Sequence, residues 1–190
     1  MDKQTISIQQ GDKTAFAALV GRFQKPLFSY LGKMTLPQAI AEEIAQETFI
    51  RAWQAKATFD PKKASVSTWL FTIARRLALN ELDRASRRFE VSSLTSAVLE
   101  SDPIVKEYED HQHLSPQEAL QQSELKQALW QALTTLPPHD RSLLALAYLK
   151  DLELAAIAEI EGIPVGTVKS RLHRIRQQLK STLSGESIHE

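Results

Sequence analysis

The segment 163–180, IPVGTVKSRLHRIRQQLK, carries five lysine and arginine residues and no acid, although the whole chain has a formal net charge of zero. Val168, Leu172, Ile175 and Leu179 recur within it at steps of three and four residues, which predicts the buried face of an amphipathic helix. The opposite face is polar and basic, so it is suited to contact phosphates and base edges. Its side chains are Thr167, Ser170, His173, Arg174 and Gln177, flanked by Lys169, Arg176 and Lys180.

The residues just before this helix complete a pattern that is typical of a DNA-binding motif. A short helical pattern, LAAIAEIEGI, buries Ile157 and Ile160, and a turn at Gly162 leads into the basic helix. This order predicts a helix-turn-helix, in which the second helix enters the major groove. A basic helix alone is often only a solvated face. The short helix, the glycine turn and the absence of acids favour the DNA-binding interpretation.

Further helices are predicted on both sides, and no segment shows the alternation of a strand, so the expected class is all-α. The sequence Ser115-Pro116-Gln117-Glu118 is a strong helix start. Helices are expected over about Glu118–Thr134, His139–Leu149 and Leu154–Glu161. Towards the N-terminus, helical periods run over 16–23, again over 27–34 after Pro26, over 41–53 and over 67–88.

Charge divides the chain into three parts. Residues 1–90 hold 14 basic and 9 acidic residues, 91–116 hold 1 and 5, and 117–190 hold 8 and 9. The acidic middle part is poor in apolar residues at a helical spacing and contains Pro103 and Pro116. We therefore expect two small helical domains, 1–90 and 117–190, joined by a flexible acidic linker over 91–116.

Composition excludes several classes of function. The chain has no cysteine, so disulfides, thiolate zinc sites and cysteine nucleophiles are ruled out. The closest histidines, His111 and His113, lie in the acidic linker without further spaced ligands, so no metal site is expected. No pattern supports catalysis or a cofactor. Because no apolar run is long enough to span a bilayer and no signal peptide is evident, we expect a cytoplasmic protein that does not itself insert into membranes.

Two segments resemble one family. LPPHDRSLLALAYLKDLELAAIAEIEGIPVGTVKSRLHRIRQQL resembles region 4 of the extracytoplasmic-function (ECF) sigma factors of the sigma-70 family, and AEEIAQETFIRAW followed by STWLFTIARRLALNELDR resembles their region 2. The resemblance implies a transcription initiation factor, not an enzyme. Region 2 would bind core RNA polymerase and the downstream (−10) promoter element, and region 4 the upstream (−35) element. An anti-sigma factor would hold the protein inactive until a stress signal.

The resemblance also implies contact residues. Polymerase would be gripped by an exposed stripe with an apolar anchor: Glu43, Gln46, Glu47, Ile50 and Arg51. The −10 element would be met by a basic loop and the polar side of the next helix: Lys62, Lys63, Ser65, Ser67, Trp69, Arg75, Arg76, Asn80 and Arg84. A tryptophan opening an apolar helix is more often a core residue, so Trp69 has two interpretations. Family members often carry asparagine at the position of Arg76, which leaves the downstream sequence preference open.

The −35 element would be contacted from the last helix. Helical phase favours Thr167, Lys169, Ser170, His173, Arg174 and Gln177. Arg171 matches a family contact position but lies nearer the buried stripe. Where the family usually has a serine and a glutamate that cap the preceding helix, this chain has Glu153 and Ala156, so the reciprocal cap is lost and weaker DNA binding is expected.

The sequence leaves two rival functions open. A stand-alone repressor would bind operator DNA without polymerase, and an adaptor would sequester a sigma-like partner, although the basic helix argues against the adaptor. The acidic linker could lie in the RNA channel of polymerase or serve as a plain spacer. Its pliability leads us to expect a compact inhibited form and an extended polymerase-bound form. We expect the free chain to bring its two units together, or an inhibitor to clamp them together, and so to hide the polymerase-binding helix and the basic helix at once.

Overall fold

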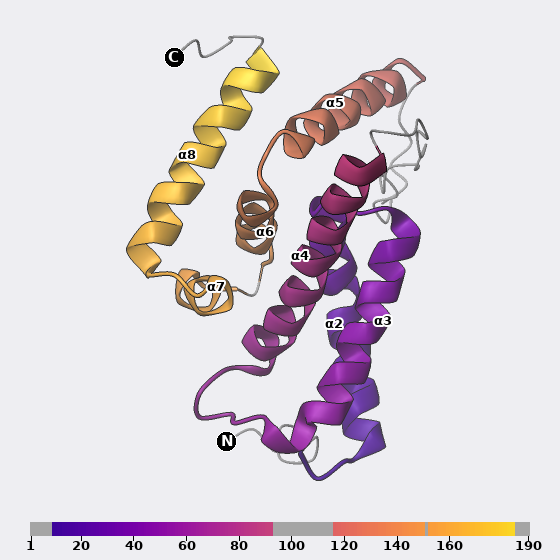
Figure 1. The fold of residues 1–190 in the computed structure, drawn as a ribbon, viewed down its shortest axis with the longest axis vertical. Helices are drawn as coiled ribbons and strands as arrows, with labels where there is room; N and C mark the ends of the chain where they lie inside the picture. Colours follow the sequence, from indigo (N-terminus) through magenta and orange to yellow (C-terminus); the bar gives the residue numbers. More distant parts are fainter. Residues whose placement is uncertain (1–8, 93–115, 151, 185–190) are drawn as a thin grey trace.

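The computed structural model describes residues 9–92, 116–150 and 152–184, and within them it contains helices and no strand. Figure 1 shows their arrangement. The elements are α2 (Lys13–Lys33), α3 (Gln38–Ala55), the one-turn 3₁₀ helix η1 (Lys56–Thr58), α4 (Val66–Ser92), α5 (Pro116–Thr134), α6 (Pro138–Ala147), α7 (Leu154–Glu161) and α8 (Val165–Ser184).

The helices α2, α3 and α4 form the first unit. Helix α2 begins at a side-chain cap, in which Asp12 Oδ1 accepts hydrogen bonds from the backbone N–H groups of Thr14 and Ala15. The two helical periods on either side of Pro26 prove to be one continuous helix. Proline removes a backbone donor inside a helix. Burial of Phe23 and Leu27, on either side of it, supplies a tertiary reason for the helix to continue.

The helices α5 to α8 form the second unit, and its last two helices are the expected helix-turn-helix. Helix α7 occupies Leu154–Glu161 as predicted, whereas α6 ends at Ala147, two residues before the expected Leu149. Gly162 terminates α7 with a φ of 68°, a left-handed conformation that glycine adopts without steric cost. The predicted stripe of α8 is confirmed, since Val168, Leu172 and Ile175 are buried and Leu179 is half-buried.

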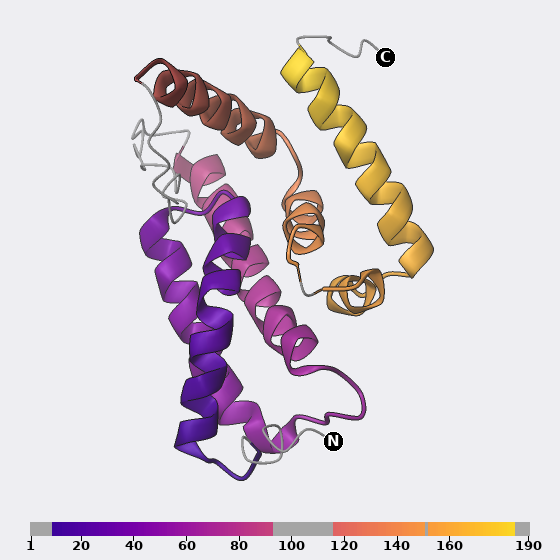
Figure 2. The ribbon, with the colours of Figure 1, turned by 180° about the vertical axis from the view of Figure 1, so that it is seen from behind.

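The two units pack directly against each other. Figures 1 and 2 show α6 and α7 lying against α4, with α8 on the far side of them, and α2 also contacts α6. A single cluster of buried side chains extends from Leu27 and Ala74 in the first unit to Leu143 and Ile157 in the second. The expected acidic linker lies largely outside the described residues, and the domain boundaries at 90 and 117 stay a prediction.

Candidate functional site

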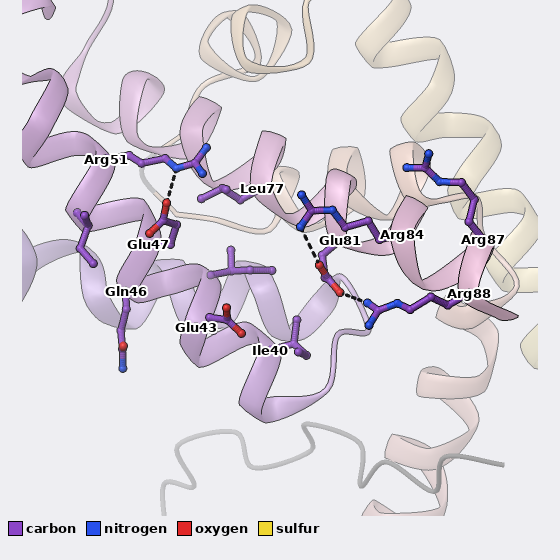
Figure 3. A pocket seen from close by; sticks show the side chains of 12 residues that line it. Ile40, Glu43, Gln46, Glu47, Arg51, Leu77, Glu81, Arg84, Arg87 and Arg88 are labelled. Atoms are coloured by element: carbon purple, nitrogen blue, oxygen red, sulfur yellow. Dashed lines mark hydrogen bonds and ion pairs between the residues drawn. The ribbon is translucent and has the colours of Figure 1, made fainter. Parts of the chain in front are cut away.

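A groove of about 800 Å³ runs between α3 and the C-terminal half of α4 (Figure 3). It contains the whole stripe that the sequence predicted as a polymerase contact, together with side chains of α4. Its lining consists of Ile40, Glu43, Ile44, Gln46, Glu47, Ile50, Arg51, Leu77, Glu81, Arg84, Arg87 and Arg88.

The groove combines apolar side chains with charges of both signs. Ile50 is 50% exposed, so an apolar side chain lies open to solvent among the charged residues of the groove. Next to it, Arg51 Nε donates to Glu47 Oε1 at 2.6 Å. Across the groove, Glu81 pairs with the arginines at positions 84 and 88 of its own helix, as the dashed lines of Figure 3 show.

Sequence reasoning missed the α4 wall of this groove. Leu77, Glu81, Arg84 and Arg88 follow one another at steps of three and four residues, so they lie on one face of α4. Arg84 was predicted to contact DNA, yet it lines the groove together with the stripe predicted to bind polymerase. The helical spacing was visible in the sequence, but its position opposite α3 depends on tertiary packing.

The loop before α4 is fixed by its own hydrogen bonds. Ser65 Oγ accepts a hydrogen bond from Thr68 N at 3.0 Å and lies 2.8 Å from Ser67 Oγ, so it acts as the cap of α4. Lys62 and Lys63 are exposed. Trp69 is half-buried and stacks on Phe59 with ring centroids 4.6 Å apart, so it forms part of the packing of the first unit.

On the polar face of α4, one predicted DNA contact differs from the rest. Arg76, Asn80 and Arg84 are exposed. Arg75 instead points into the second unit, where its Nε donates to Glu161 Oε1 and its terminal nitrogen to Glu161 Oε2, both at 2.8 Å. The side chain of Arg75 is 17% exposed and that of Glu161 only 2%.

The Arg75–Glu161 pair belongs to a buried polar network that joins four helices. Ser142 Oγ donates to Glu161 Oε1 at 2.6 Å, and the Tyr30 hydroxyl lies 3.0 Å from Ser142 Oγ. Burial raises the pKa of the Tyr30 phenol well above its ordinary value, so this group stays a neutral hydrogen-bonding partner. A second polar contact joins the units where Arg141 donates to the backbone carbonyl of Met34 at 3.3 Å.

The predicted DNA-facing side of α8 remains open. Its exposed members are Lys169, Ser170, His173, Arg174 and Gln177, and its half-buried members are Thr167 and Arg171. Because this face and Ile50 in the groove stay exposed, the contact between the units does not by itself hide the predicted polymerase-binding helix and the basic helix. That an inhibitor clamps the units together and covers both stays a prediction. The contact between the units leaves the groove and the face of α8 accessible, but it largely buries the side chain of Arg75.

Three further predictions concern a helix cap, a pair of histidines and membrane insertion. Glu153 precedes α7 and makes no side-chain cap, in line with the lost cap. His111 and His113 lie outside the described residues. Across 9–92, 116–150 and 152–184, no helix is both long and apolar enough to cross a membrane.

Comparison with known proteins points to one family. The family model for Sigma-70 region 2 matches residues 19–88, and the model for Sigma-70, region 4 matches residues 126–179. The ECF RNA polymerase sigma factor SigW of Bacillus subtilis is 31% identical over 185 residues, with 95% of each chain covered. The RNA polymerase sigma-H factor of Pseudomonas aeruginosa is 32% identical, covering 96% of this chain and 93% of the relative.

Solved structures share the fold at lower identity. CnrH, solved in complex with the cytosolic domain of CnrY, has a TM-score of 0.66 at 21% identity and covers 97% of both chains. The sigma factor RpoE of Bartonella quintana, solved with the anti-sigma factor NepR, has a TM-score of 0.68 at 21% identity. It covers 90% of this chain and 98% of its own.

Proposed function

The chain belongs to the ECF group of sigma-70 family RNA polymerase sigma factors, and on that premise we propose that it directs core polymerase to specific promoters. It is a transcription initiation factor and not an enzyme. The observation that carries the proposal is the presence, in one chain, of an open groove on the region 2 match and an exposed basic helix on the region 4 match.

The groove between α3 and α4 is the proposed site for a coiled coil of the largest polymerase subunit. A helical partner fits it, because the groove offers an apolar anchor at Ile50 between charged walls. The acidic side chains Glu43 and Glu47 would meet basic residues of that coiled coil. Arg87 and Arg88 at the other wall would meet acidic ones.

Two further surfaces are proposed to contact promoter DNA. The exposed face of α8 would read the −35 duplex from the major groove, with Arg174 and its basic neighbours on phosphates. The loop around Lys62 and the face of α4 with Arg76 and Asn80 would engage the −10 element. Trp69 is not assigned to this surface, because it packs on Phe59.

The contact between the units supports a silent state of the free chain. Arg75 cannot bind a phosphate or base while its guanidinium holds Glu161. We propose that an anti-sigma factor stabilises this compact form, as the anti-sigma factor NepR accompanies the similar structure of RpoE, and that a stress signal releases it. The same role places the protein in the cytoplasm, where bacterial polymerase acts.

Transcription with purified components tests the proposed function. Core polymerase is combined with the full chain and a library of promoter fragments from its own bacterium, and RNA 5′ ends are mapped. We expect transcripts from a limited set of sites that require both core polymerase and the chain. A repressor or an adaptor would yield no chain-dependent transcript, and that outcome would reject the proposal.

A further inference from the structure

Arg174, at the middle of the exposed face of α8, is held by an acid from a different helix. Its terminal nitrogen donates to Asp140 Oδ2 of α6 at 2.7 Å. We infer that Asp140 is a positioning residue for DNA binding, which fixes the Arg174 guanidinium on the DNA-facing surface. The inference rests on the proposed function, since it concerns the residue assigned to DNA phosphates.

Asp140 is a rigid support for this contact. Its side chain is 7% exposed, and it lies in the first turn of α6, where its backbone N–H donates to the carbonyl of Pro137 at 2.9 Å. A carboxylate near the N-terminus of a helix is stabilised by the helix dipole. Burial therefore restricts the conformations open to the Asp140 side chain.

Arg174 remains available to a second partner. Its side chain is 65% exposed, and the hydrogen bond to Asp140 involves one of its terminal nitrogens. A guanidinium has five N–H donors in a planar fork, so most of them are left for phosphate oxygens. An arginine on a surface helix otherwise samples many rotamers, and holding it in one orientation lowers the entropy lost on binding.

The competing effect is that Asp140 neutralises Arg174 and repels phosphates. Burial decides between the two effects, because DNA approaches the outer face of α8 and meets the exposed guanidinium before the buried carboxylate. The two possibilities predict opposite signs. Removal of the carboxylate weakens binding if Asp140 positions Arg174, and strengthens binding if Asp140 masks it.

A double-mutant cycle on the full chain separates them. Affinity for a 30-base-pair mixed-sequence duplex is measured across a series of salt concentrations for the wild type, Asp140→Asn, Arg174→Ala and the double variant. We expect Asp140→Asn to weaken binding about fivefold in the presence of Arg174 and to cause no further loss in the Arg174→Ala background. Asp140→Glu, which keeps the carboxylate, should recover part of the affinity.

Each remaining outcome overturns the inference for a different reason. Tighter binding by Asp140→Asn would show masking. An equal loss with and without Arg174 would show that Asp140 acts through the stability of α6, which thermal unfolding would register separately. If Arg174→Ala changes neither affinity nor its salt dependence, the DNA contact itself is wrongly assigned, and the transcription assay then tells whether the proposed function survives.

Discussion

Arg75 of α4 and Glu161 of α7 form a two-point ion pair between the two units, with both hydrogen bonds at 2.8 Å. The carboxylate of Glu161 is almost fully removed from water, and its hydrogen-bonding partners there are Arg75 and Ser142. Since Arg75 lies on the helix face predicted to meet the −10 element, docking of the units and use of Arg75 on DNA exclude each other.

Glu161→Gln should loosen the contact between units. Removing one partner of a buried ion pair costs about 3 to 5 kcal/mol, because the other charge is left unpaired. Arg75 would leave the interface and the units would separate. The chain has no cysteine, so two introduced at positions 56 and 181 can carry fluorophores that report the separation. Glu159→Gln, an exposed change on the same helix, serves as the control and should leave the distance unaltered.

Core polymerase should produce the same separation in the labelled chain that keeps Glu161. In a promoter complex one unit is proposed to bind the −10 element and the other the −35 element. Simultaneous binding is expected to favour an extended form of the chain over the compact one. The label pair at 56 and 181 should therefore report a longer distance once core polymerase is added. An identical distance with and without polymerase would contradict the two-state description.

Glu47→Lys should weaken binding to core polymerase by more than about tenfold, because it reverses a charge in the centre of the groove and places it beside Arg51. The side chain is on the surface, so the fold should persist. Glu42→Lys makes the same charge change on α3 outside the groove lining and should bind normally. Equal affinities of the two variants in a pull-down would remove the groove assignment.

Arg174→Ala should reduce the salt dependence of DNA binding as well as the affinity. Each phosphate contact contributes about 0.9 to the slope of log affinity against log salt for duplex DNA. Arg22→Ala on α2 removes another exposed positive charge, one that lies on the first unit, and controls for net charge. A slope equal to that of the wild type would mean that Arg174 is only solvated.

Tyr30→Phe tests the far end of the buried network. Loss of the hydroxyl should lower the free energy of unfolding by about 1 kcal/mol at neutral pH, since Ser142 loses a partner. The raised pKa of Tyr30 also predicts a pH dependence. The unfolded chain releases this proton near pH 10 and the folded chain retains it, so wild-type stability falls as the pH rises above about 10. Denaturant titrations should show a shallower alkaline fall for Tyr30→Phe.

Local periodicity predicted the elements of the second unit well. The buried stripe of α8, the bounds of α7 and the turn at Gly162 all depend on neighbours in sequence, and the structure confirms them. The continuity of α2 through Pro26 was not foreseen. It follows from burial on both sides of the proline, and that burial is a tertiary property.

The sequence patterns did not predict the contact between the units, although one buried acid in α7 indicated that such a contact exists. Ile157, Ile160 and Glu161 share the buried face of α7, and an acid on a buried face requires a partner. The pattern did not identify Arg75, because the two residues are 86 positions apart. The α3 wall of the groove was predicted, whereas the α4 wall depended on the same kind of long-range packing.

The exposure of both the groove and α8 in the compact form has a consequence for timing. A chain whose units are still docked leaves the proposed polymerase surface and the proposed duplex-reading helix exposed, so on this proposal encounter with either partner would not await any rearrangement. Arg75 would become available only later, when the units part. Promoter recognition would then proceed in stages. Binding of the chain to polymerase would stay reversible until the ion pair between Arg75 and Glu161 breaks.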